Sequence, residues 1–260
     1  MQKVNYGNWV PEKMLVLYWI ISVLFGVLFT AGCVFAWKFP VVLFTGILFF
    51  LMLASALYMQ LCHHIFSFTG GKLMAKVHDY LLEKMEWDGS GTLIDIGCGS
   101  GAVTIKCAKK YPAARITGID YWGKTWNYAK EQCERNAEAE GVKDRISFIK
   151  GDAAVLPFPD GTFDAAVSNF VFHEVMSQSD KRLVVHEALR VVKKGGRFAF
   201  HDLFEHKELY GDMHEFVEEL RTEGYTEIAY EPHTEKLAVI PDIVKAPWML
   251  SGLGLLYGRK

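Results

Sequence analysis

Two long uncharged stretches open the chain, ahead of a regular alternation of short apolar runs and amphipathic segments. Residues 14–37 carry no charged side chain, and as a helix of about 24 residues they would extend roughly 36 Å. Residues 41–61 form a second such stretch, which at about 21 residues is also long enough to cross a hydrocarbon core of about 30 Å. We therefore expect residues 1–65 to form a two-helix transmembrane hairpin that turns near Pro40, a residue suited to the first turn of a helix.

The pattern favours this hairpin over a signal peptide or a soluble pair of helices. A cleaved signal peptide is shorter and is not doubled, and a soluble helical hairpin would need a polar face, which neither stretch has. Ser22, Gly26 and Thr30 place small residues at every fourth position, which lets helices approach closely; they can seat the second span or the hairpin of a second copy in a homo-oligomer. Basic residues are more frequent near both ends of the hairpin than at Lys38 in its turn, so we expect an integral membrane protein with its catalytic domain in the cytoplasm.

Beyond residue 66 the apolar pattern alternates between strand-like runs and helical periods. The alternation predicts an α/β domain over residues 66–260, built on a doubly wound, mostly parallel sheet. The expected strands are Thr92–Ile96, Arg115–Asp120, Ile146–Lys150, Phe163–Asn169, Arg197–Asp202, Thr226–Tyr230 and Met249–Gly258. The expected helices are Lys72–Trp87, Ala102–Lys110, Lys124–Glu140, Asp180–Val192 and Leu209–Glu223. Because no helix separates the last two strands, they should pair as an antiparallel hairpin at the sheet edge.

Composition narrows the choice of partners. At 260 residues there is room for one good-sized domain and an appendage. The net charge of −2 gives no electrostatic preference for nucleic acid, so none is expected. The five cysteines include no Cys-x-x-Cys pair, which argues against a disulfide framework. No metal site is expected at the run Cys62-His63-His64, because adjacent residues on a helix rarely point at one ion.

A glycine-spaced acidic turn lies at residues 93–101, with the sequence Leu-Ile-Asp-Ile-Gly-Cys-Gly-Ser-Gly. An apolar strand, a tight turn and a helix start in this order hold a nucleotide-like cofactor at the edge of a parallel sheet. Gly97, Gly99 and Ala102 also fit a dinucleotide fingerprint, but a carboxylate at Asp95 would tend to repel the pyrophosphate of such a ligand. S-adenosylmethionine carries an ammonium and a sulfonium instead, so an acid here favours it.

Further polar side chains stand where the following strands end. Asp120 ends the second strand, at a position where an acid can hold both hydroxyls of a ribose. Asp152 follows the third strand, where it can accept from an adenine amino group, and Asn169 ends the fourth. Because ligands of open α/β sheets bind at the carboxyl ends of the strands, these groups should converge on one cofactor.

Four ordered segments, residues 95–101, 118–120, 151–164 and 187–197, make the chain resemble the class I S-adenosylmethionine-dependent methyltransferases. The resemblance covers roughly residues 73–260 and is strongest to the branch that includes the ubiquinone and menaquinone biosynthesis C-methyltransferases. It implies a seven-stranded Rossmann-like sheet with one antiparallel strand. This chain departs from the branch, which is usually soluble, by its membrane hairpin. The substrate-covering segments of the branch are not matched either, so the quinone substrate does not transfer.

The resemblance also implies S-adenosylmethionine as cofactor and S-adenosylhomocysteine as product. It places the methionine moiety near the glycine turn, the ribose at the end of the second strand and the adenine at the end of the third, against Tyr121. The residues expected to bind the cofactor are Asp95, Gly97, Cys98, Gly99, Gly101, Asp120, Tyr121, Asp152, Ala153 and Asn169.

Methyl transfer is an in-line displacement that needs alignment and sometimes a base. His173 follows the fourth strand and suits proton removal at neutral pH; a role in capping or packing alone is left open. His201 and Asp202 end the fifth strand on the same side and are further catalytic candidates. The long segment 231–247 is apolar for a loop, which indicates a lid, a membrane contact, or packing on the domain.

The expected function is a membrane-anchored methyltransferase that acts on a small hydrophobic or membrane-partitioned acceptor, such as a lipid, quinone, sterol or lipophilic xenobiotic. The accepting atom stays open. One alternative keeps the enzyme but gives it a soluble acceptor, with the hairpin serving only localisation. Another is a non-enzymatic membrane sensor that binds the cofactor, and a nicotinamide oxidoreductase is the weakest.

Overall fold

The computed structural model describes residues 4–123, 130–225 and 227–260. Contacts divide the chain into two compact units. One unit runs from Gly7 to Ala75, and the other joins the N-terminal residues up to Tyr6 to the chain from Lys76 onward. The contact boundary after Ala75 lies ten residues beyond the expected domain boundary between residues 65 and 66, and the domain boundary itself stays a prediction.

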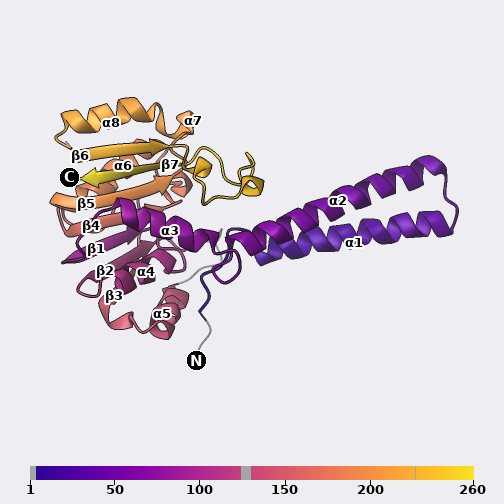
Figure 1. The fold of residues 1–260 in the computed structure, drawn as a ribbon, viewed down its shortest axis with the longest axis horizontal. Helices are drawn as coiled ribbons and strands as arrows, with labels where there is room; N and C mark the ends of the chain where they lie inside the picture. The colour runs from indigo at the N-terminus through magenta and orange to yellow at the C-terminus, as the bar shows by residue number, and fades with distance from the viewer. Residues whose placement is uncertain (1–3, 124–129, 226) are drawn as a thin grey trace. The chain divides into compact units, whose positions relative to one another are not determined.

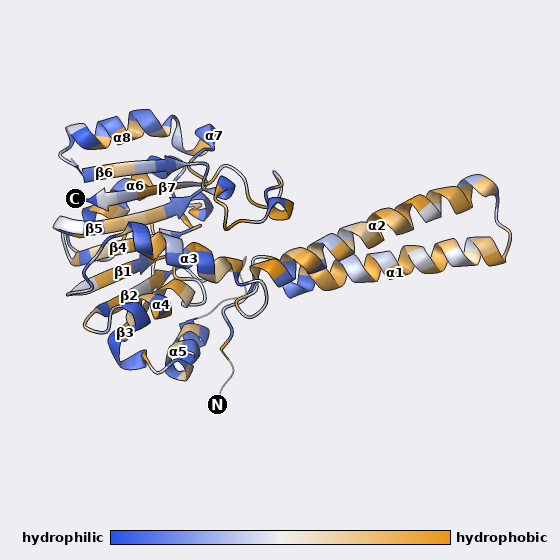
Figure 2. Ribbon diagram, in the orientation of Figure 1, coloured by the Kyte–Doolittle hydropathy of each residue, from blue (hydrophilic) through white to orange (hydrophobic). Residues whose placement is uncertain are grey.

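The first unit contains two long apolar helices, α1 (Glu12–Val34) and α2 (Phe39–Phe66), which are coloured almost throughout as hydrophobic in Figure 2. By length and composition both are able to cross a membrane, and only 11% and 17% of their most apolar windows are buried within the protein. They begin and end a few residues from the expected spans, and α2 continues five residues beyond Leu61, so the run Cys62-His63-His64 is helical.

Glycines let the two helices of this unit pack closely. A Cβ atom on Gly26 would lie 2.9 Å from Cε2 of Phe49, and one on Gly46 would lie 2.9 Å from Cε2 of Phe29. The two phenyl rings stack with their centroids 6.3 Å apart. Gly26 therefore seats the partner helix of the same chain, as one of the two expected roles requires. Thr30 is exposed, and a contact with a second copy through it stays a prediction.

The second unit is built on a seven-stranded sheet of order β3-β2-β1-β4-β5-β7-β6 (Figure 1). Its strands are β1 (Thr92–Ile96), β2 (Arg115–Asp120), β3 (Ile146–Lys150), β4 (Phe163–Asn169), β5 (Val192–Asp202), β6 (Glu227–Pro232) and β7 (Gly254–Arg259). Strand β7 pairs antiparallel with both β5 and β6, and the other pairs are parallel. This confirms the mostly parallel seven-stranded sheet and its antiparallel C-terminal hairpin.

Helix α3 (Leu73–Lys84) begins in the last residues of the first unit and continues into the second. The other helices of the second unit are α4 (Ala102–Lys110), α5 (Lys130–Ala139), α6 (Lys181–Arg190), α7 (Lys207–Tyr210) and α8 (Met213–Thr222). The single helix expected over 209–223 is wrong: Gly211 adopts φ 67°, and Asp212 caps a new helix by accepting from the backbone of His214. The expected strand 249–258 begins only at Gly254, and β5 begins five residues earlier than expected. Residues 124–129 of the expected helix 124–140 lie outside the described residues.

Apolar clusters cover both faces of the sheet. Neighbouring residues of β1 point to opposite sides, so Leu93 packs with α3 and α4 while Ile94 packs with α6 and α8. Both faces of a parallel sheet are buried in this way, which leaves its edges and loops to bind ligands.

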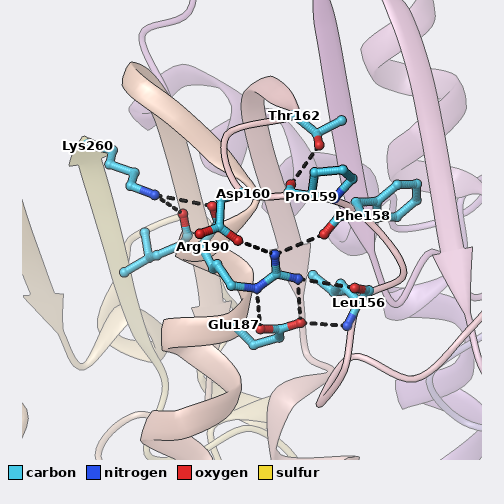
Figure 3. A network of polar contacts seen from close by, with 9 residues as sticks. Leu156, Phe158, Pro159, Asp160, Thr162, Glu187, Arg190 and Lys260 are labelled. Atoms are coloured by element: carbon cyan, nitrogen blue, oxygen red, sulfur yellow. Dashed lines mark hydrogen bonds and ion pairs between the residues drawn. The ribbon is translucent and has the colours of Figure 1, made fainter.

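Two of the segments that carried the family resemblance bind each other. In Figure 3 the guanidinium of Arg190 on α6 donates to Glu187, to Asp160 and to the backbone carbonyls of Leu156 and Phe158. Glu187 in turn accepts from the Leu156 amide at 2.6 Å. A bidentate guanidinium–carboxylate pair is geometrically specific, so this network fixes the loop between β3 and β4. These motif residues therefore have a structural role rather than a chemical one.

Candidate active site

The glycine turn after β1 requires glycine at several positions. Gly97, Gly99 and Gly101 all have positive φ values, of 76°, 54° and 82°. A Cβ atom on Gly97 would also lie 2.2 Å from a methyl group of Val171, which follows β4. The turn therefore packs against the end of the neighbouring strand and opens its backbone toward the carboxyl edge of the sheet.

Asp120 links this turn to the end of β2. Its Oδ2 atom accepts from the amide of Gly99 at 2.8 Å, and its Oδ1 atom accepts from the amide of Trp122 at 2.7 Å. The indole of Trp122 donates to the Gly99 carbonyl at 2.9 Å. Burial raises the pKa of the Asp120 carboxyl, and the backbone donors act in the opposite direction.

Asp95 is enclosed by protein, with 1% of its surface exposed. Its carboxyl accepts from the Thr104 hydroxyl on α4 at 2.5 Å. Burial raises the pKa of Asp95 to about 7, and the nearby charge of Asp120 adds to the effect, while the Thr104 hydrogen bond opposes it. A carboxyl in this state gains from a nearby cation, because the cation favours its ionised form.

The expected adenine-side residues stand at the ends of β2 and β3. Asp152 Oδ1 accepts from the amide of Ala154 at 2.9 Å, which closes a tight turn next to Ala153. The Tyr121 ring is 65% exposed, with the Lys150 ammonium 5.6 Å from its centroid. Its apolar face is therefore available to a planar ligand at this edge.

His173 and Asp202 form a hydrogen-bonded pair beside the end of β4. The His173 Nδ1–H donates to Asp202 Oδ1 at 2.7 Å, and Asp202 is only 1% exposed. Burial alone would lower the pKa of His173, but the hydrogen bond and charge of Asp202 outweigh it and raise that pKa. The position of the carboxylate is fixed by backbone donors from Val171, Phe172 and Leu203.

His201 is buried, at 2% exposure, and is therefore closed to an acceptor. Its Nε2 atom lies 2.7 Å from the Thr234 hydroxyl, and its Nδ1 atom lies 3.3 Å from Asn169 Oδ1. Burial lowers the pKa of His201 to about 4, so the ring is neutral at pH 7. Its place in the fold is to hold Asn169 and the β6–β7 segment together.

One more part of this site leaves no pattern in the sequence. The amide of Asn5 donates to Asn136 Oδ1 at 2.9 Å, and the carbonyl of Asn5 accepts from Asn136 Nδ2 at 2.7 Å. Asn136 Nδ2 also donates to the Ser100 carbonyl, and the Ser100 hydroxyl donates to the carbonyl of Tyr6. We call Asn5 and Tyr6 the N-terminal strap, since they are bound across the glycine turn.

The histidines of α2 belong to the first unit. His63 Nδ1 lies 2.9 Å from the Val10 carbonyl within the first unit, which gives this histidine a structural contact. Among the residues that the structure describes, no group of three or more histidine, cysteine or acidic side chains could hold a metal ion.

The chain is similar to known methyltransferases. Residues 94–200 match a family model described as "Methyltransferase domain". Sterol 4-C-methyltransferase strm-1 of Caenorhabditis elegans is 31% identical over 179 residues, which are 63% of this chain and 51% of that protein. Demethylmenaquinone methyltransferase of Thermus thermophilus is 32% identical over 105 residues, which are 40% of this chain and 44% of that protein. The chain thus spans about half the length of these relatives. The crystal structure of the cyclase SpnF shares the fold, with a TM-score of 0.53 at 22% identity over 71% of this chain and 80% of that one.

The sheet order agrees with the Rossmann-like fold of the class I S-adenosylmethionine-dependent methyltransferases, which the sequence predicts. Residues 94–200 match the methyltransferase-domain family model, and the similar proteins support S-adenosylmethionine as the cofactor of the domain.

Replacing Asn136 with alanine should weaken binding of S-adenosylmethionine about tenfold, because two or more hydrogen bonds of about 1 kcal/mol each hold the strap and the turn together. Calorimetry on the full chain in detergent measures this. Gln132→Ala, which removes only one exposed bond to the same strap, is the matched control and should change affinity little. Equal affinities for both variants and the wild type would show that the N-terminal strap does not contribute to cofactor binding.

Proposed function

We propose that this protein is a membrane-anchored methyltransferase that transfers a methyl group from S-adenosylmethionine to a lipid-like acceptor. The observation that carries the proposal is the short connection along the chain between the residue bound at the glycine turn and the first apolar helix. Tyr6 is bound to Ser100 in that turn, and only residues 7–11 separate it from α1, which begins at Glu12. The relatives described above are named for a sterol and for demethylmenaquinone, both lipid-soluble molecules, which supports the same class of acceptor. We further propose that the catalytic domain lies in the cytoplasm.

His173 is the proposed catalytic base. S-adenosylmethionine supplies an electrophilic methyl group on a positively charged sulfur. The acceptor atom forms a bond to that carbon while the carbon–sulfur bond breaks, and the acceptor proton passes to His173 Nε2. Asp202 holds the ring through Nδ1 and stabilises the imidazolium that results. Asp202 and His201 are buried, so in this proposal they position other groups rather than touch the acceptor.

Exchanging His173 for glutamine should lower kcat about 100-fold, the usual contribution of a positioned base, and leave cofactor affinity unchanged. Activity of the wild type should rise with pH as His173 loses its proton, with a midpoint above the ordinary value of 6.5. Steady-state kinetics across about pH 5–9 measures both effects. Glu174→Gln removes a charge 3.7 Å from His173 Nε2 that helps to raise the pKa of His173, so it should lower the midpoint and keep kcat at high pH. An unchanged kcat in His173→Gln would remove His173 from the chemistry.

The proposed function is tested with the full chain in lipid nanodiscs, S-adenosylmethionine labelled in its methyl group, and a total lipid extract. We expect label in the organic phase that is absent with Asp120→Ala. Label found only in water-soluble products would favour a soluble acceptor. Tight cofactor binding without transfer to any extract would favour a sensor.

A further inference from the structure

The exposed apolar side chains of the second unit are concentrated at one edge of its sheet. Among the described residues of this unit, seven large hydrophobic side chains are more than one-third exposed. All except Leu183 lie in segments that leave the carboxyl ends of strands. The six are Tyr121, Val155, Met176, Val239, Ile243 and Trp248. Tyr121 and Val155 follow β2 and β3, where the family resemblance places the cofactor. The other four have no role in the site described above.

We define Met176, Val239, Ile243 and Trp248 as the rim surface. Trp248 is 76% exposed and Met176 is 92% exposed. Three of these residues come from the segment between β6 and β7, which projects from the end of the sheet in Figure 1, and Met176 follows β4. Soluble domains seldom gather large apolar side chains on one edge unless that edge contacts another apolar surface.

The rim surface is carried by an ordered scaffold. In the β6–β7 segment, Ile240 and Val244 are buried at 2% and 0%, while Val239 and Ile243 beside them face outward. Thr234 ties the same segment to His201 at the end of β5. On the other side, Lys181 donates to the carbonyls on both sides of Met176, at Val175 and Gln178.

We propose that the rim surface inserts into the interfacial layer of the membrane, so that the part of the site that would receive the methyl acceptor faces lipid. This rests on the proposed function only for the presence of a bilayer. Residues 7–11 connect Tyr6, which is bound at the same edge of the sheet, to α1 and can extend at most about 17 Å. A bilayer spanned by α1 is therefore within reach of this edge. Tryptophan favours the headgroup layer, and the only charges from Leu237 to Leu253, Asp242 and Lys245, form an ion pair at 2.7 Å.

A depth measurement tests this on the full chain in nanodiscs. In a Cys33→Ser background, which removes the one exposed cysteine among the described residues, Ile243→Cys carries an environment-sensitive fluorophore. Lys194→Cys, exposed at the opposite end of β5, is the matched control. We expect the label at 243 to shift to the blue and to be quenched by nitroxide-bearing phospholipid, and the label at 194 to do neither. Equal behaviour of both labels would overturn the proposal. A blue-shifted but unquenched label at 243 would also overturn it, since it would indicate burial against protein.

A double variant, Ile243→Ser with Trp248→Ser, tests the consequence for catalysis. Methyl transfer to lipid-borne acceptor should fall about tenfold, the effect of losing roughly one buried apolar side chain, with cofactor affinity unchanged. Leu183→Ser, on an exposed apolar residue outside the rim surface, should change neither. The fluorescence experiment uses phospholipid alone. Quenching without methylation of any lipid would therefore contradict the lipid-like acceptor and support the membrane contact. Methylation of lipid without quenching would support the acceptor and contradict the membrane contact.

Discussion

Replacing Asp120 with alanine should abolish measurable binding of S-adenosylmethionine, a loss of at least about 100-fold, because hydrogen bonds to a charged acceptor contribute roughly 1.5–3 kcal/mol each. Asp120 has two tasks in this site. It holds the amides of Gly99 and Trp122, which shapes the glycine turn, and the family resemblance assigns its remaining acceptor capacity to the ribose hydroxyls. Alanine removes both contributions at once.

Calorimetry with S-adenosylhomocysteine, the reaction product, measures this loss without turnover. Asp120→Asn keeps one acceptor oxygen and should fall between the alanine variant and the wild type. Asp144→Ala, which removes an exposed acid of the same charge, should bind normally. Wild-type affinity in Asp120→Ala with an intact melting transition would contradict the assignment of the ribose to this residue.

Asp95→Asn should change stability and cofactor binding in opposite directions. The pKa of Asp95 is raised to about 7 in the folded protein, from an ordinary value of 3.8. The folded state therefore keeps this proton more strongly than the unfolded state, and stability of the cofactor-free protein falls as the pH rises from about 4 to about 7. Each pKa unit corresponds to about 1.4 kcal/mol, so the neutral asparagine should be about 2–4 kcal/mol more stable than the wild type at pH 8.

The same substitution removes the negative charge that, in the site expected from the sequence, attracts the cationic cofactor. Affinity should fall about tenfold or more at pH 8, and the wild-type increase of affinity with pH through about 7 should disappear. Thermal melting with and without cofactor, at about pH 5 and about pH 8, measures both effects on either side of that pKa. A variant that is less stable than the wild type at the higher pH, or that keeps the pH-dependent affinity, would contradict the charge state given to Asp95.

The parallel part of the fold was predictable because its strands are short apolar runs bounded by turn residues. The bounds of β1 to β4 and of α4 agree with those expected from the pattern. The hydrophobic pattern gave wrong predictions where apolar residues are buried without forming a helix or a strand. Residues 249–253 are apolar enough for a strand, yet Leu250 and Leu253 are buried from a loop. Gly211, which has a positive φ, ends one helix within a segment whose apolar residues otherwise recur at helical spacing.

For the site, the sequence identified candidate functional side chains but not which of them contact one another. The acids at the strand ends followed from the rule that parallel strands present their carboxyl ends at one edge. The contact of His173 with Asp202 depends on β4 and β5 being neighbours, and the strap contact of Asn5 with Asn136 joins positions 131 residues apart. Neither leaves a local pattern, since both arise from packing between distant segments.

Uptake of the acceptor from the bilayer is tested most directly by surface dilution. The full chain is reconstituted with the lipid fraction that accepts the methyl group, held at constant bulk concentration, and inert phospholipid is added to lower its mole fraction. We expect the rate of methyl transfer to fall in proportion to the mole fraction, with the affinity for S-adenosylmethionine unchanged. A rate that follows bulk concentration and ignores dilution in the membrane would contradict a lipid-borne acceptor.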